Sequence, residues 1–156
     1  MKDAVVTRRT AVRGFPVAVT RRNGVVVEVS LRPKPGRNDP ELGREIERVL
    51  ESGVIPGRLR VDLSGLPEFT RRVLRTCARI RPGRTMTYAE LARKAGRPRA
   101  ARAVGQVMAR NPFPLLIPCH RVVRSDGSPG GYVGGQTMKQ KLLAAESRPG
   151  RMVLTG

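Results

Sequence analysis

The sequence has few of the residues that build metal sites, disulfide frameworks or membrane spans. Its 156 residues include two cysteines, Cys77 and Cys119, a single histidine, His120, and no tryptophan. Two distant cysteines and one histidine cannot supply the ligands of a usual zinc site, so we expect no bound metal. No stretch approaches the roughly 20 apolar residues of a membrane span, and the N-terminal region lacks the apolar core of a signal peptide. We therefore expect a soluble cytoplasmic protein with reduced thiols and no membrane association.

Acidic and aromatic residues are also scarce. Twelve Asp and Glu residues stand against 31 Lys and Arg residues, which gives a formal net charge of +19 and a pI near 11.7. A surface of this charge attracts polyanions, and nucleic acid is the commonest of them. A ribosomal-type protein or an arginine-rich, heat-adapted sequence would show the same composition. Aromatic residues make up only 3% of the chain, so the core must be mainly aliphatic.

Hydrophobic periodicity places the chain in the mixed α/β (α+β) class and divides it into two predicted lobes. Residues 1–63 are expected to form a scaffold of antiparallel sheet and helix, and residues 64–156 a mainly helical lobe. Strands are expected over about 15–19, 25–31, 59–63 and 115–117. Helices are expected over about 40–51, 67–80, 88–95, 98–110 and 137–146, with a frayed tail after Ser147.

Short local signals mark turns and helix starts. Asn23-Gly24, between the first two expected strands, is a strong hairpin signal. Asp39-Pro40 is typical of a helix start, and both Thr87 with Glu90 and Thr137 with Gln140 have the spacing of a capping box. Two short helices within residues 87–110, joined by a glycine-containing turn, predict a helix-turn-helix.

The second helix of this pair carries a stripe of very small side chains. Ala101, Gly105 and Ala109 lie along one line of the helix, beside Arg102. A glycine inside a helix costs about 1 kcal/mol relative to alanine, so something should offset that cost. Either a neighbouring helix or a DNA groove could lie against such a stripe, and the sequence favours neither.

Cys119 is the main candidate for chemistry, because it lies beside the only histidine of the chain. A thiol reacts as its thiolate, so near neutral pH it needs a base or positively charged neighbours. His120 could act as the base through a water molecule or a sharp turn, and Arg121 and Arg124 could supply positive charge. Glu146 could orient His120, or it could simply be an exposed surface residue.

Several segments between residues 67 and 146 match one family in their order along the chain. They are the helix containing Phe69, Thr87-Tyr88, Arg99 to Gly105 (RAARAVG), Asn111-Pro112, Pro118 to Val122 (PCHRV) and Gly131 to Gly135 (GYVGG). Together they resemble the O6-alkylguanine-DNA alkyltransferases, also called methylated-DNA–protein-cysteine methyltransferases. The first sixty residues match this family only in architecture.

The resemblance implies roles for the residues around the cysteine. Cys119 is implied to accept the alkyl group, and His120, held by Glu146, to take its proton through a water molecule. Asn111 is implied to brace the turn that carries Cys119. Tyr88 is implied to donate a proton towards the departing guanine.

The resemblance also implies a DNA-binding surface and a base pocket. Arg102 is implied to enter the base stack where the target nucleotide leaves it. The other implied DNA contacts are Ala101, Gly105, Tyr88 and Arg121. The implied pocket residues are Met108, Pro118, Tyr132, Val133 and Gly134. Val133 departs from the family pattern, because many members carry there a hydroxyl residue that can hydrogen-bond to the O6 atom of the substrate.

The implied activity is a single, irreversible transfer of an alkyl group from O6-alkylguanine, and in some cases O4-alkylthymine, in double-stranded DNA to Cys119. The helix-turn-helix is implied to enter the minor groove while the target base is flipped out. A monomer, associated with the nucleoid and without cofactor or obligate protein partner, is expected. The alternatives are a lesion-binding relative that transfers nothing and a helix-turn-helix regulator.

Overall fold

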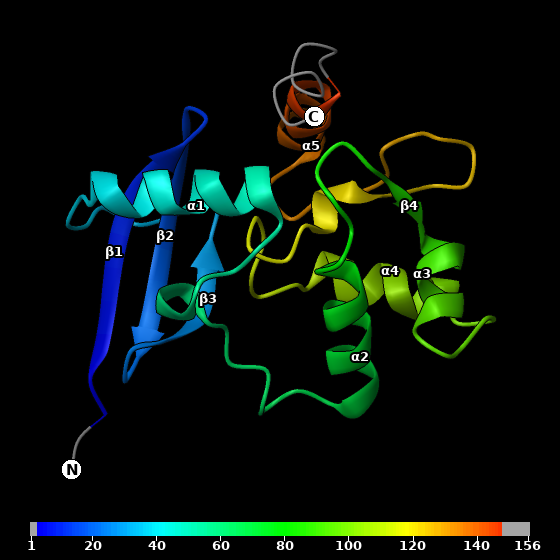
Figure 1. Cartoon of the computed structure of the whole chain (residues 1–156), viewed down its shortest axis with the longest axis horizontal. Coiled ribbons are helices and arrows are strands. Elements are labelled where there is room, and N and C mark those ends of the chain that lie inside the picture. The colour runs from blue at the N-terminus through cyan, green and yellow to red at the C-terminus, as the bar shows by residue number, and fades with distance from the viewer. Residues whose placement is uncertain (1–2, 148–156) are drawn as a thin grey trace.

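The computed structural model describes residues 3–147, in which a small antiparallel sheet with one long helix stands beside a group of shorter helices (Figure 1). The sheet has the order β1-β2-β3, formed by β1 (Val5–Val12), β2 (Phe15–Arg22) and β3 (Val25–Ser30). Helix α1 (Pro40–Ser52) packs on β1, and Gly43 makes this close approach possible because a Cβ there would lie 2.6 Å from the carbonyl oxygen of Ala11. The mixed α+β class is confirmed.

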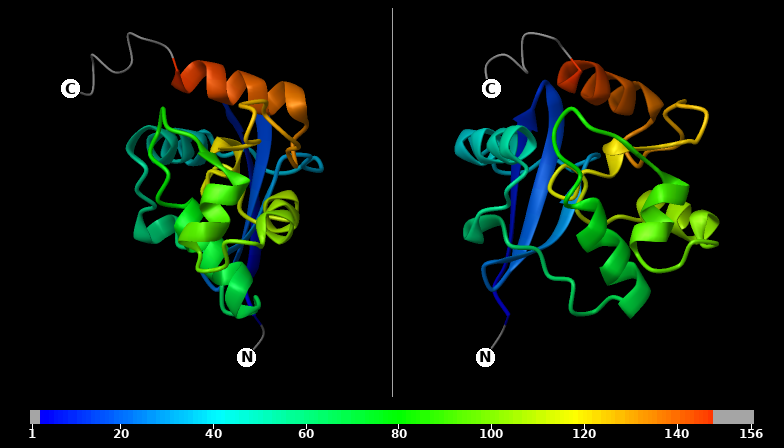
Figure 2. Two further views of the ribbon diagram at one scale, coloured as in Figure 1. Left: turned by 90° about the vertical axis from the view of Figure 1, so that its right-hand side faces the viewer. Right: turned by 45° about the vertical axis from the view of Figure 1, so that its right-hand side comes forward.

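The remaining helices gather on the β3 side of the sheet (Figure 2). They are α2 (Glu68–Cys77), α3 (Tyr88–Lys94), α4 (Ala101–Ala109) and α5 (Gln136–Glu146). A short parallel pairing joins β4 (Met86–Thr87) to β5 (Val122–Val123), and two single-turn 3-10 helices, η1 (Gly57–Leu59) and η2 (Cys119–Arg121), complete the elements. The β4–β5 pairing places the segment after Cys119 directly beside the start of α3.

One continuous aliphatic core connects the sheet with the helices. Val26 of β3, Ile46 of α1, Leu74 of α2, Leu91 of α3 and Leu142 of α5 all belong to it and are fully or almost fully buried. The predicted division at residue 63 lies in the irregular segment between η1 and α2, and two separate folding units stay a prediction. Within residues 3–147, no helix is long and apolar enough to cross a membrane.

The local signals for turns and caps are mostly confirmed. The hairpin at Asn23-Gly24 has φ angles of 52° and 82°, as a type I′ turn requires. The side chain of Asp39 accepts from the backbone N–H of Leu42, and that of Thr87 from the N–H of Glu90. The cap at Thr137 is wrong, because α5 begins at Gln136 after Gly135 and no side chain caps it.

Two expected strands are absent from the structure, and one strand that the sequence does not predict is present. Strand β1 was not expected, because consecutive Arg8 and Arg9 interrupt its alternation and its outer face is exposed. The strand over 59–63 is wrong, since only an isolated bridge joins Val61 to β3. The strand over 115–117 is also wrong, because Leu115 has a φ of +75° and the chain turns back on itself there. The expected tail after Ser147 lies outside the described residues.

Candidate active site

The turn that carries Cys119 is held by an asparagine. The side-chain amide of Asn111 donates to the carbonyl oxygen of Ile117 at 3.1 Å, and its oxygen accepts from the backbone N–H of Phe113 at 2.9 Å. Asn111 is itself buried, so these bonds are shielded from water. They close the loop between α4 and η2 and fix the first residue of η2, Cys119, which matches the bracing expected of Asn111.

His120 and Glu146 form a buried pair behind this turn. The Nε2 atom of His120 lies 2.8 Å from Oε1 of Glu146, and the two residues are 0% and 3% exposed. The expectation that Glu146 is near His120 is thereby met, and its reading as an exposed surface residue is wrong. Burial lowers the pKa of His120 despite the opposing effect of Glu146, so the imidazole is neutral near pH 7. A neutral ring that donates through Nε2 leaves Nδ1 free to accept a proton.

Arg121 does not lie on the surface. Its guanidinium binds both carboxylate oxygens of Glu146 and donates to the carbonyl oxygens of Ile80, at 2.8 Å, and Leu50, at 3.0 Å. The residue is 1% exposed. The expectation that Arg121 contacts DNA is therefore wrong, because all its donor groups are engaged inside the protein. Its contacts instead connect α1, the segment that follows α2, and α5.

This arginine also changes the electrostatics of Glu146. Burial would raise the pKa of Glu146, but hydrogen bonds from His120 and Arg121 outweigh burial and hold the pKa at about 2. The carboxylate is therefore ionised across the neutral range. It can compensate the positive charge that His120 would acquire on taking a proton.

The resting thiol of Cys119 is not activated by its surroundings. Burial raises its pKa to about 11, against smaller lowering effects from Asn111 and Lys139. Arg121 was expected to supply positive charge to this thiol, but it is paired with Glu146 instead. Cys119 is 3% exposed, so an incoming group must displace neighbouring side chains to reach the sulfur.

Lys139 is a buried cation near the thiol that sequence reasoning missed. Its ammonium donates to the carbonyl oxygens of Val122, at 2.6 Å, and Gly131, at 3.1 Å. Burial lowers its pKa to about 8. A signal was present, because Lys139 and Glu146 are seven residues apart on α5, on the same face as buried Leu142.

Tyr88 lies at the junction between the thiol and α4. It is the first residue of α3, and a Cβ on Gly130 would come within 2.8 Å of its hydroxyl oxygen. Gly130, with a φ of +76°, therefore allows the loop to pass directly over the phenol. Burial raises the pKa of Tyr88, so its hydroxyl is protonated and able to donate.

The residues expected to line the base pocket differ in their exposure to solvent. Met108 and Pro118 are buried, Tyr132 and Gly134 are partly buried, and Val133 is 36% exposed. A Cβ on Gly134 would lie 2.6 Å from Sδ of Met138 and 2.9 Å from the Leu31 side chain, so a larger residue there would have to displace these side chains.

The outer face of α4 is exposed, and packing inside the protein does not require its side chains to be small. Arg102 is exposed, and Ala101 and Gly105 are partly exposed. A Cβ on Gly105 would meet only Tyr88 Cδ1, at 3.9 Å, which is ordinary van der Waals contact. Packing within the protein therefore does not explain the glycine, and the alternative of an external partner close to the helix gains weight.

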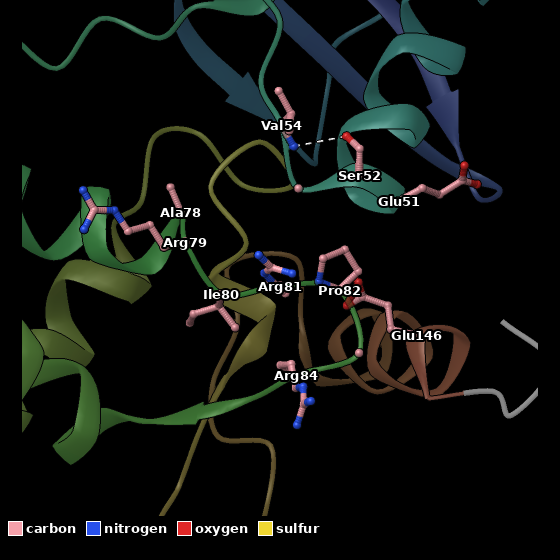
Figure 3. A pocket seen from close by; sticks show the side chains of 12 residues that line it. Glu51, Ser52, Val54, Ala78, Arg79, Ile80, Arg81, Pro82, Arg84 and Glu146 are labelled. Carbon is pink, nitrogen blue, oxygen red and sulfur yellow. Dashed lines mark hydrogen bonds between the residues drawn. The ribbon is translucent and has the colours of Figure 1, made fainter. Parts of the chain in front are cut away.

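Cavities border the site from different sides. A cavity of about 310 Å³ lies between Tyr88, Ala101 and the exposed Arg124, at the start of α4. A larger one of about 660 Å³ lies between the end of α1, residues 78–84 and the end of α5, where Arg81 and Glu146 share its wall (Figure 3). The smaller cavity adjoins the exposed face of α4, and the larger one lies behind the His120–Glu146 pair.

Comparisons with known proteins agree with this geometry. Residues 68–148, just over half the chain, match the family model described as 6-O-methylguanine DNA methyltransferase, DNA binding domain. The chain is 51% identical over 86 residues to the methylated-DNA–protein-cysteine methyltransferase of Methanothermobacter thermautotrophicus, covering 55% of this chain and 48% of that protein. It is 44% identical over 107 residues to that of Methanosarcina barkeri, covering 66% of this chain and 67% of the other. The chain thus spans about half to two thirds of the length of these two relatives.

A solved structure extends the similarity over nearly the whole fold. The crystal structure of Mycobacterium tuberculosis OGT in complex with DNA superimposes with a TM-score of 0.75 at 27% sequence identity. The match covers 96% of this chain and 99% of that one, and therefore includes the sheet that the family model leaves out.

Proposed function

Because the chain belongs to the 6-O-methylguanine DNA methyltransferase family, we propose that it repairs double-stranded DNA by moving an alkyl group from O6 of guanine to Cys119. The observation that carries this proposal is the buried contact, 2.8 Å long, between His120, which follows Cys119 in η2, and Glu146 at the end of α5. A thiol with a pKa of about 11 needs a base to react near neutral pH, and a neutral imidazole backed by a carboxylate is such a base.

The proposed reaction is one displacement at carbon. The Cys119 proton passes through a water molecule to Nδ1 of His120, and Glu146 stabilises the resulting imidazolium. The sulfur then forms a bond to the alkyl carbon from about 3–3.5 Å, opposite the leaving oxygen. The carbon–O6 bond breaks and its electron pair stays on guanine, which takes a proton from Tyr88. The thioether formed has no leaving group of comparable quality, so each molecule acts once.

The target nucleotide must leave the base stack before its alkyl carbon can lie in line with the Cys119 sulfur. An O6 substituent inside the duplex cannot be reached in line, so the nucleotide has to leave the stack at a cost of a few kcal/mol. We propose that α4 lies in the minor groove, with Ala101 and Gly105 against the sugar–phosphate walls and Arg102 in the vacated position. The N-terminus of α4 has no side-chain cap, and with Arg124 it can receive a phosphate.

The charge of the protein supports the same partner. A net charge of +19 gives sequence-independent attraction to the phosphate backbone, which suits a protein that scans DNA for rare damage. The minor groove reads little sequence, which again suits a lesion scanner. We propose that a single protein molecule repairs one lesion without a cofactor.

A labelled-lesion assay tests the proposal against its alternatives. The protein is incubated with a duplex that contains one O6-methylguanine, radiolabelled in the methyl group, and with the matched undamaged duplex. Transfer of label to the protein, saturating at one methyl per molecule, is expected. Preferential binding without transfer would indicate a lesion-recognition protein, and equal binding to both duplexes would indicate a regulator.

A further inference from the structure

Two polar atoms near the thiol are buried without a partner. Nδ1 of His120 and the hydroxyl oxygen of Tyr132 are both shielded from solvent and make no hydrogen bond among the described residues. Buried polar atoms nearly always have a partner, and an ordered water that makes two to four hydrogen bonds is the usual one. Two such atoms in one region point to a shared water site.

The geometry of the two rings fits one bridging molecule. The His120 and Tyr132 rings meet edge to face, with centroids 6.4 Å apart and an interplanar angle of 79°. Because Nε2 of His120 is fixed on Glu146, Nδ1 is turned away from the carboxylate. One water with two bonds of about 2.8 Å joins polar atoms up to roughly 5 Å apart, so a single water can bridge two neighbouring rings.

We propose that the Tyr132 hydroxyl and Nδ1 of His120 together hold the water through which Cys119 loses its proton, which makes Tyr132 a positioning residue of the proton relay. This inference rests on the proposed function, and it adds a polar role to a side chain otherwise assigned only as a pocket wall.

The hydrogen bonds balance in both states of the relay. Before transfer, the water accepts from the Cys119 thiol and from the Tyr132 hydroxyl and donates to Nδ1. After transfer, it accepts from protonated Nδ1 and again from Tyr132, and donates to the thiolate. Tyr132 donates throughout and never loses its proton. The phenol is suited to this, because burial, with smaller effects of Cys119 and Glu146, raises its pKa well above the usual value.

Charged and titratable groups from several elements interact electrostatically with the residues proposed to hold this water. Beyond Cys119, His120 and Tyr132 they are Arg13 after β1, Cys77 of α2, Tyr88 of α3, Arg121 of η2, and Lys139 and Glu146 of α5. Arg121 is paired with Glu146, and Lys139 with backbone carbonyls. These groups set the common electrostatic background, which a Tyr132→Phe substitution leaves in place.

Tyr132→Phe removes the hydroxyl and keeps the ring. We expect the rate of alkyl transfer near pH 7 to fall about tenfold, as for the loss of one net hydrogen bond, while the affinity for lesion-containing DNA stays the same. We also expect the rise of rate with pH to move to higher pH. Rate–pH profiles that superimpose for the variant and the wild type would overturn the proposal.

Two further measurements separate this inference from the proposed function. Reaction of Cys119 with iodoacetamide, measured in a Cys77→Ala background, reports the thiol without any DNA, and the same displacement of its pH profile is expected in Tyr132→Phe. If the wild type transfers no alkyl group from DNA but this displacement is present, the proposed function fails and the water site stands. A high-resolution crystal structure should show a water bonded to both atoms, and their direct contact or a dry gap would overturn the inference even if the variant did not fold.

Discussion

The proton relay and the face of α4 differ in what holds their residues in place. Around Cys119, the charged residues Arg121, Lys139 and Glu146 are almost completely buried and bonded to one another or to backbone carbonyls. On α4, Arg102 is exposed, and Gly105 has no close neighbour that requires its small size. Changes in the relay should therefore disturb folding and chemistry together, whereas changes on the exposed face of α4 should impair the encounter with DNA without destabilising the fold.

The largest effect is expected at Arg121. Arg121→Met removes one partner of a buried ion pair and leaves the Glu146 charge uncompensated, so we expect a loss of about 3–5 kcal/mol in the free energy of unfolding. Urea denaturation followed by circular dichroism measures this loss. The double variant Arg121→Met with Glu146→Gln removes both charges and should lose less than the sum of the two single variants. Strict additivity would mean that the pair is not coupled.

His120→Gln should separate chemistry from binding. We expect transfer near pH 7 to slow by about 100-fold or more, because the thiol loses its base. The remaining rate should rise about tenfold per pH unit, since the thiolate fraction grows until pH approaches the Cys119 pKa of about 11. Single-turnover transfer rates between pH 6 and 10 measure this dependence. A pH-independent residual rate would contradict the assigned role of His120.

Arg102→Ala should reduce repair of duplex DNA by about tenfold while reaction with a free O6-alkylguanine base is unchanged. The expected cause is the loss of the side chain that fills the vacated position, and a tenfold effect corresponds to about 1.4 kcal/mol. Arg75→Ala on α2 removes the same charge from another exposed position and serves as the control. Equal losses with both substrates, or equal losses in both variants, would remove the special role of Arg102.

Two helical glycines should respond in opposite directions. Gly105→Ala should stabilise the free protein by up to about 1 kcal/mol and yet weaken DNA binding several-fold, because the new methyl group points towards the partner and not towards the core. Gly43→Ala should destabilise the protein, since its Cβ would lie 2.6 Å from both Thr10 Oγ1 and the carbonyl oxygen of Ala11. Thermal denaturation and fluorescence anisotropy with labelled duplex measure the two effects. Unimpaired DNA binding by Gly105→Ala would argue against α4 as the contact surface.

Local signals in the sequence were sufficient for much of the fold. The Asn23-Gly24 hairpin and the Asp39 and Thr87 caps involve only neighbouring residues, and all three are present. The apolar run Leu115 to Ile117 predicts a strand, but the bonds of Asn111 and tertiary packing bend it into a turn.

Long-range contacts explain why the sequence wrongly predicts that Arg121 lies on the DNA-binding surface. The short motif places Cys119 beside His120, but the partners of Arg121 lie 25, 41 and 71 residues away, at Glu146, Ile80 and Leu50. Nothing local distinguishes this arginine from the many exposed ones of a strongly basic chain. Only the assembled fold reveals that it is an internal residue.

The most direct test of the central claim is to identify the atom that receives the alkyl group, since the chain offers two buried thiols for comparison. After reaction with methyl-labelled O6-methylguanine duplex, peptide mass spectrometry should find the methyl group on Cys119. Cys77→Ser should keep transfer and Cys119→Ser should abolish it. Label on Cys77 or on any other residue, or full transfer by Cys119→Ser, would contradict the account.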